Sequence, residues 1–115
     1  MIIRNVTKNT ILADECLAAE SFASRFMGLM GRNSIASGGG LLIVPCNSIH
    51  MFFMKFPIDI VFLNKGSKVV YIIEGIRPWK VSKLVRNAHS VLELPSGTIK
   101  TCLTEVGDEL EMVKE

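Results

Sequence analysis

Short apolar runs, some alternating with polar residues and some continuous, cover most of the chain and are separated by polar turn residues. Runs of this length that are rich in β-branched residues are typical of strands. The pattern predicts seven or more short strands, with candidates at residues 2–6, 11–18, 41–44, 58–63, 69–73, 91–94, 99–103 and 110–113. Two hairpins are expected, one across residues 7–10 and one across residues 64–67.

One segment changes to a helical period. Its apolar residues recur at i, i+4, i+7 and i+8, at Phe22, Phe26, Leu29 and Met30. Ser21 can cap the first turn, and Gly31 can end the helix in a left-handed conformation. We therefore expect one helix over residues 22–30, which packs Phe22, Phe26 and Met30 onto the sheet. Together these elements predict a mainly β fold, a single compact β-sandwich or barrel-like domain over residues 1–115.

Composition supports one well-packed domain and argues against several kinds of partner. The chain has 115 residues, of which 49% are hydrophobic, enough for one core. Its net charge of +2 is too small for a dedicated nucleic-acid-binding domain. The first residues lack the features of a signal peptide, and polar residues interrupt the most hydrophobic region, 41–63, before it could span a membrane. We expect a cytoplasmic protein with no nucleic-acid partner and no membrane partner.

Three ionisable residues, His50, Lys55 and Asp59, lie in the otherwise apolar run 49–63. A charge buried without a partner costs several kcal/mol, so such residues are paired or functional. We expect Asp59, on a strand covered on both sides, to be charge-paired or hydrogen-bonded. His50 leaves three interpretations open: a buried and hydrogen-bonded residue, a ligand-binding residue, or an acid/base catalyst.

Soft donor atoms near His50 raise the question of a metal. Cys46, Met51 and Met54 could bind copper(I) together with His50, but their spacing matches no known copper motif, and methionine among phenylalanines usually fills a core. Cys46 and His50 could form a nucleophilic pair, yet nothing nearby in the sequence supplies an orienting third group. The three cysteines lie far apart and form no C-x-x-C pair. We predict reduced structural thiols, no metal and no cofactor.

A second set of candidates consists of arginines and carboxylates, namely Arg25, Arg32, Asp59, Glu93 and Asp108. Arg32 could form a buried ion pair with Asp59 or Glu93. Alternatively, an arginine of this set could face a cleft and hold an anionic ligand. Both interpretations remain open from the sequence.

Basic residues also surround the one tryptophan, Trp79, at Arg77, Lys80, Lys83 and Arg86. Stacking on Trp79 with phosphate contacts would suit a nucleic-acid single strand. Four charges and one aromatic ring are a weak electrostatic signal, so a solvated loop edge is the favoured interpretation.

Several ordered motifs resemble those of one widespread prokaryotic family. They are R-x-x-G-L-M-x-R at 25–32, G-G-L-L-I at 39–43, I-H-x-F-F-M-x-F-P-I-D at 49–59, V-L-E-L-P-x-G at 91–97 and G-D at 107–108. Nearly the whole chain thus resembles domain of unknown function 192, also called uncharacterised protein family 0127. The resemblance implies a mainly β, sandwich-like single domain and no established activity, substrate or cofactor. Residues 53–57 replace the W-M-K-N-T-type motif of many members, so the chain resembles the histidine-containing branch.

The leading functional hypothesis is a binding module for an unknown small molecule or protein, with a modest pocket near His50. Its candidate ligand-binding residues are Arg32, His50, Met54, Asp59 and Glu93. One alternative is an enzyme that uses His50 with Asp59 or Glu93 as an acid/base pair. Another is a protein-interaction module that docks through residues 49–56. No catalytic residue is assigned from the sequence.

Overall fold

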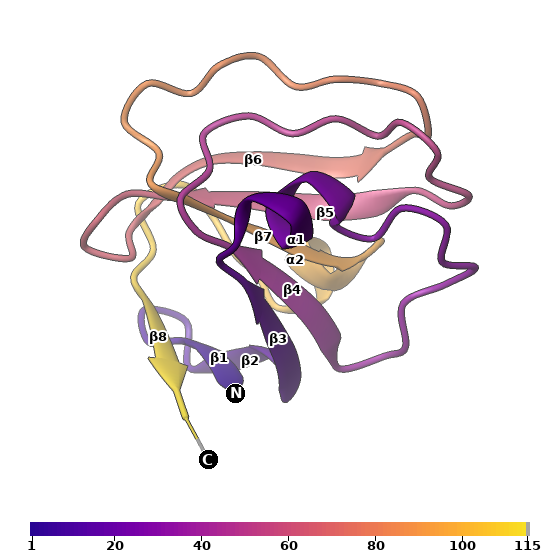
Figure 1. Cartoon of the computed structure of the whole chain (residues 1–115). Coiled ribbons are helices and arrows are strands. Elements are labelled where there is room, and N and C mark those ends of the chain that lie inside the picture. The colour runs from indigo at the N-terminus through magenta and orange to yellow at the C-terminus, as the bar shows by residue number, and fades with distance from the viewer. Residues whose placement is uncertain (115) are drawn as a thin grey trace.

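A computed structural model describes residues 1–114, apart from the side chains of Phe22 and Phe26. Within these residues the chain forms eight strands and two short helices (Figure 1). Their order is β1 (Ile2–Asn5), β2 (Thr10–Ala13), β3 (Glu15–Ala19), α1 (Phe22–Met27), β4 (Gly39–Ile43), β5 (Ile58–Leu63), β6 (Val69–Ile76), β7 (Ser90–Pro95), α2 (Thr98–Thr101) and β8 (Leu110–Val113).

The strands form two open sheets, which confirms the predicted mainly β fold without barrel closure. The smaller sheet has the order β2-β1-β8, and the larger has the order β3-β4-β7-β5-β6. Only the β3–β4 pair is parallel among the pairings described. Strand β7 is the middle strand of the larger sheet, so residues on β7 have hydrogen-bonded neighbours on both sides.

Both faces of the larger sheet are covered, because side chains that alternate along its strands enter two separate cores. Leu42, Val61 and Leu92 belong to a cluster that joins the two sheets and α2. The residues next to them, including Leu41 and Ile60, belong to a second cluster with side chains from α1's following turn and the long loops. Figure 1 shows the small sheet at the bottom of the molecule and the long loops after β4 and β6 arching over the top.

The predicted helix 22–30 is shorter than expected. Helix α1 has six residues and ends at Gly28 instead of Gly31. Ser21 caps it in a reciprocal box with Ser24, each side chain accepting the other residue's backbone N–H. Gly28 has φ 47° and ψ −125°, which strongly favours glycine and turns the chain away from the helix axis. The expected packing of Phe22 and Phe26 lies outside the described residues.

Two strand predictions are wrong. Residues 11–18 form two strands in different sheets, because the chain turns at Asp14, where the backbone N–H groups of Asp14 and Glu15 both donate to the Gly38 carbonyl. Residues 99–103 begin in helix α2 instead of forming a strand. A one-turn helix is too short to show a helical period, and α2 has one buried residue, Ile99.

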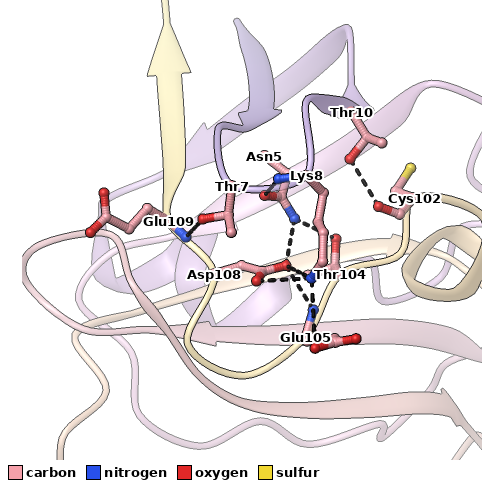
Figure 2. Close-up of polar contacts among 9 residues, drawn as sticks. All are labelled: Asn5, Thr7, Lys8, Thr10, Cys102, Thr104, Glu105, Asp108 and Glu109. Carbon is pink, nitrogen blue, oxygen red and sulfur yellow. Dashed lines mark hydrogen bonds and ion pairs between the residues drawn. The ribbon is translucent and has the colours of Figure 1, made fainter.

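A buried polar cluster joins β1 and its following turn to the segment before β8 (Figure 2). Asn5 Nδ2 donates to Asp108 Oδ2 (2.9 Å) and Thr104 Oγ1 (3.2 Å), and Lys8 Nζ lies 2.9 Å from Asp108 Oδ2. Burial acts to raise the pKa of Asp108, but the hydrogen bonds from Asn5, Lys8 and the Glu105 backbone outweigh it and lower that pKa. Since Asp108 is already surrounded by donors, we assign this cluster to the fold.

Among the described residues, no helix has the length and apolar character needed to cross a bilayer.

Candidate functional site

The carboxyl group of Glu93 is the most unusual polar group in the core. Glu93 lies on the middle strand β7, opposite Leu41 on β4 and Ile60 on β5. Its side chain is only 5% exposed. Among the described residues its Oε1 atom has no hydrogen-bond partner. Burial raises the pKa of Glu93 from 4.5 to about 7, because removing a carboxylate from water disfavours its charged form.

Strand alternation explains why the Glu93 side chain points to the loop-covered face of β7. Leu92 and Leu94 enter the core between the two sheets, whereas Val91 enters the core under the loops. Glu93 therefore lies on the loop-covered face with Val91. On this face an apolar residue would complete the second core, yet the chain places a carboxyl group there. Burying an unpartnered polar group costs about 1–3 kcal/mol, so packing alone does not favour an acid here.

Glu93 lines a small cavity of about 40 Å³ between the sheet and the loops. The other lining residues are Arg25, Met27, Gly28, Leu29, Met30, Ile43, Cys46, Ser48, Ile49, His50 and Met54. A cavity needs roughly 10–15 Å³ to hold one water, so this one has room for a few water molecules or for one small polar group of a ligand. Its walls are polar and apolar in about equal parts, and its ionisable side chains are Arg25, Cys46, His50 and Glu93.

Gly28 leaves space beside the Glu93 carboxyl. A Cβ atom built at Gly28 would lie 3.6 Å from Glu93 Oε1. The same glycine ends helix α1 with a positive φ, so any side chain here would be strained as well as close to the acid. The R-x-x-G part of the first motif thus places an open backbone beside this carboxyl and an arginine on the wall of the same cavity.

Arg25, in the last turn of α1, supplies the positive charge of the cavity. Among the described residues its one hydrogen bond, from Nη1 to the Pro45 carbonyl oxygen, is long at 3.4 Å. A guanidinium has five N–H donors, so most of its donor capacity remains for water or a ligand. Arg25 is half-buried, which keeps its charge less screened than at an open surface.

His50 lies at the edge of the cavity and connects it to the loop surface. It is half-buried, and its Nδ1 accepts the Phe52 backbone N–H at 3.3 Å. A neutral imidazole that accepts at Nδ1 carries its proton on Nε2. Its backbone pairs with Val81 in an isolated bridge. Met54 is buried behind it, in the core under the loops.

Cys46 lines the same cavity but is held as a thiol. Its Sγ donates to the Ser48 carbonyl at 2.9 Å. Burial, with a smaller contribution from nearby Glu93, raises the pKa of Cys46, and a thiol with a raised pKa is a poor nucleophile. In the described part of the chain, no three His, Cys, Asp or Glu side chains are grouped to hold a metal ion.

Two of the residues predicted from the sequence lie elsewhere. Arg32 is exposed and borders a different surface groove, with Glu15 and Ile35. Asp59 is fully buried, and its carboxylate accepts backbone N–H groups from Gly75 (2.8 Å), Gly97 (3.0 Å) and Ile99 (2.9 Å). This confirms that Asp59 is hydrogen-bonded. The described residues include no ion pair between Arg32 and either Asp59 or Glu93.

The structure therefore brings His50, Met54 and Glu93 to one cavity, which Arg25 also lines and Arg32 does not. The sequence contained a signal for Arg25, because the arginine stands one helical turn before Gly28 in the first motif. The sequence could not rank Arg25 above Arg32, because both arginines belong to the same motif and nothing in it shows which one faces the cavity. Helix α1 ends at Met27, so Arg32 is not carried on it.

The loops around the cavity have a one-sided charge. Residues 44–57 and 77–89 contain no Asp or Glu but five Lys or Arg. The small net charge of the whole chain, +2, hides this asymmetry because the acidic residues lie in the remaining segments. A surface with one sign of charge raises the local concentration of ligands with the opposite sign.

Comparison with known proteins gives consistent matches over the chain. A family model described as Uncharacterized ACR, domain of unknown function 192, matches residues 3–112. A UPF0127 protein of Pyrococcus furiosus is 35% identical over 112 residues, which cover 93% of this chain and 94% of that protein.

Two solved structures have a similar fold. A protein of unknown function from Novosphingobium aromaticivorans superposes with a TM-score of 0.83 at 20% identity, covering 96% of this chain and 82% of that one. A Sinorhizobium meliloti protein superposes with a TM-score of 0.79 at 25% identity, covering 96% of this chain and 89% of that one.

Proposed function

We propose that this chain, which belongs to the family called domain of unknown function 192, is a binding module for small carboxylate-bearing molecules. The proposal rests on the geometry of its cavity. The observation that carries the proposal is the buried Glu93 Oε1, which has no hydrogen-bond partner in the described residues. A ligand that fills the cavity beside Glu93 would supply the missing partner and offset the energy of burying the acid.

The charge around the cavity favours an anion over a cation. Arg25 is half-buried at the cavity and has donors to spare, and a guanidinium matches the geometry of a carboxylate. The loops over the cavity, 44–57 and 77–89, carry five Lys or Arg and no acid. A cation would have to approach against this field, whereas an anion is attracted by it.

Glu93 is suited to donate a hydrogen bond to such an anion. With its pKa raised to about 7, a substantial fraction of Glu93 is protonated at neutral pH, and a protonated carboxyl has an O–H donor. An acid kept neutral by an apolar environment can therefore bind an anion that an ionised acid would repel. Binding and protonation of Glu93 support one another, so binding of the anion should raise the pKa of Glu93 further.

The test is a titration with acetate, followed by NMR chemical shifts, at about pH 6 and about pH 8. For a group with a pKa near 7, the protonated fraction falls about tenfold between these values, so acetate affinity should fall about tenfold. Glu93→Gln keeps a hydrogen-bond donor without a titratable proton, so it should bind acetate with little dependence on pH. Arg25→Gln should weaken binding at both pH values.

Arg32→Gln is the matched control, since Arg32 is exposed and borders another groove. It should leave acetate binding unchanged. Methylammonium is the matched cationic probe. Tighter binding of methylammonium than of acetate, increasing with pH and abolished in Glu93→Gln, would show that Glu93 serves as a carboxylate for a cation and would overturn the proposal.

An acid/base enzyme is the second candidate, because His50 and Glu93 line one cavity and the pKa of Glu93 is raised to about 7, close to the value that suits a general base at neutral pH. The two candidates differ in what happens to the ligand. A carboxylic acid that exchanges with the cavity and is recovered unchanged supports binding. Chemical conversion that disappears in both His50→Ala and Glu93→Gln would support the enzyme.

A further inference from the structure

A cluster of aromatic side chains lies exposed on the loops beside the cavity. Phe52, Phe53 and Trp79 are 41%, 60% and 58% exposed. The Trp79 ring centroid lies 4.9 Å from that of Phe53 and 6.0 Å from that of Phe52. We call these three residues the aromatic surface. They come from different loops, 44–57 and 77–89, which the structure holds side by side.

The backbone that carries the aromatic surface is pinned in an unfavourable conformation. Phe53 and Trp79 have φ values of 62° and 69°, a left-handed region in which bulky residues are rare. The Trp79 N–H donates to the Met51 carbonyl and the Met51 N–H to the Lys80 carbonyl, both at 2.7 Å. Both rings are exposed, so burial of the side chains does not offset the energy of this backbone conformation. Strained backbone conformations are concentrated at functional sites.

His50 makes the aromatic surface continuous with the cavity. It lines the cavity, and its ring centroid lies 4.9 Å from that of Phe52. An apolar path therefore runs from the cavity through His50 and Phe52 to Trp79. The cavity itself, at about 40 Å³, holds only a small end group, so a larger ligand would have to extend along this path.

We infer that the ligand is an amphipathic carboxylate, whose carboxylate enters the cavity at Arg25 and Glu93 and whose apolar chain lies on the aromatic surface. This inference rests on the proposed function and names the class of ligand. Burial of an apolar chain against aromatic rings stabilises the complex in proportion to the area removed from water. Lys55, Arg77 and Lys80 stand within two residues of Phe53 or Trp79 in the sequence, and this positive charge favours an anionic ligand over a cationic one.

Two sources can offer this chemistry: a free aliphatic acid and the C-terminal carboxylate of a peptide. Hexanoate represents the first source. Acetyl-Phe-Leu with a free carboxylate represents the second, and acetyl-Phe-Leu amide is its uncharged control. The probe that binds more tightly, hexanoate or the peptide acid, identifies the source. The peptide amide has no carboxylate and should not bind.

Trp79 provides a direct readout, because it is the one tryptophan of the chain. Hexanoate should shift the tryptophan emission to shorter wavelength, as the ring moves out of water, whereas acetate should bind without this shift. The four additional methylene groups should increase affinity about tenfold or more over acetate, less than full burial of each would give.

Trp79→Gly removes the ring at a position whose positive φ suits glycine, so the variant keeps the backbone without strain. In Trp79→Gly the advantage of hexanoate over acetate, measured by NMR titration, should shrink to about twofold, while acetate affinity stays as in the parent protein. Leu103→Gly is the matched control, since Leu103 is also exposed (62%) with φ 59° but borders a separate groove. It should keep the full advantage.

The outcomes separate this inference from the proposed function. Acetate binding that depends on Arg25 and Glu93, with no added affinity for hexanoate or the peptide acid, would overturn the inference and leave the proposed function standing. An equal gain for hexanoate in the parent protein and in Trp79→Gly would also overturn it. If neither acetate nor hexanoate binds, the proposed function is overturned, and the inference that rests on it is overturned as well.

Discussion

At the scale of single residues, three buried carboxyl groups have different roles because their partners differ. Asp59 accepts three backbone N–H groups, Asp108 is surrounded by Asn5, Lys8 and a backbone amide, and Glu93 Oε1 has no partner in the described part of the chain. The sequence shows Asp59 and Glu93 among apolar residues and Asp108 between Gly107 and Glu109. It does not show their partners, since those come from distant segments, and so it could not separate the structural acids from the candidate functional one.

Glu93 should make the folded protein less stable as pH rises. Its pKa is higher in the folded state, about 7, than the ordinary value of 4.5. Between these values the unfolded chain has released the proton and the folded protein still holds it, so stability falls with increasing pH. At 1.36 kcal/mol per pKa unit the full effect is about 3 kcal/mol. Urea unfolding across this range should show the decrease, and Glu93→Gln should abolish it and be more stable than the parent at about pH 8.

Asp59→Ala should destabilise the fold strongly, by about 3–5 kcal/mol, because three backbone N–H groups lose their acceptor in the core. Chemical denaturation measures the change. Glu74→Ala is the control, since Glu74 is an exposed acid on the neighbouring strand β6. Equal stability of the two variants would show that the Asp59 hydrogen bonds contribute little.

At the scale of elements, prediction succeeded where an element is long enough to display its period. The β5–β6 hairpin and β7 were expected from alternation and turn residues and are present. Helix α2 was missed because one turn has no period. Its first N–H groups, at Gly97 and Ile99, donate to the carboxylate of Asp59 on the distant strand β5, and the sequence does not show this contact. The loop cover over β7 was also not predictable, because β7 shows which residues share a face but not which segment covers that face.

The end of helix α1 offers a test of the cavity geometry. Gly28→Ala should lower stability, because φ is positive there, and should also abolish acetate binding, because its methyl group would lie against Glu93 Oε1. Gly31→Ala has the same backbone penalty, with φ 78°, but meets no atom within 4 Å. It should lose stability and keep acetate binding. Loss of binding in both variants would mean that backbone strain alone disturbs the site.

At the scale of the whole molecule, a buried polar cluster at Asp108 stabilises the small sheet, and its residues do not line the Glu93 cavity. Asp108 joins β1 to the segment before β8 (Figure 2). Because the pKa of Asp108 is lowered in the folded state, the carboxylate stabilises the fold above its ordinary pKa of 3.8 and loses this effect as pH falls through the folded pKa.

Asp108→Asn should therefore destabilise the protein at neutral pH, by about 2–3 kcal/mol for hydrogen bonds to a charged group, and reduce its sensitivity to acid. Acetate binding to the folded variant should be unchanged, since Asp108 is not among the residues that line the cavity. Glu105→Gln is the control, because the Glu105 side chain is exposed. If Glu105→Gln shifts the unfolding midpoint as much as Asp108→Asn does, the loss of stability comes from surface charge and not from the buried hydrogen bonds.

The central claim is that Glu93 is a buried acid, protonated near neutral pH and open to an anionic ligand. The most direct measurement is a pH titration of the Glu93 side-chain carboxyl by ¹³C NMR, with and without acetate. The pKa without ligand should be about 7, and acetate should raise it, because the anion binds the protonated form. A pKa near the ordinary 4.5, or one that acetate lowers, would contradict the account.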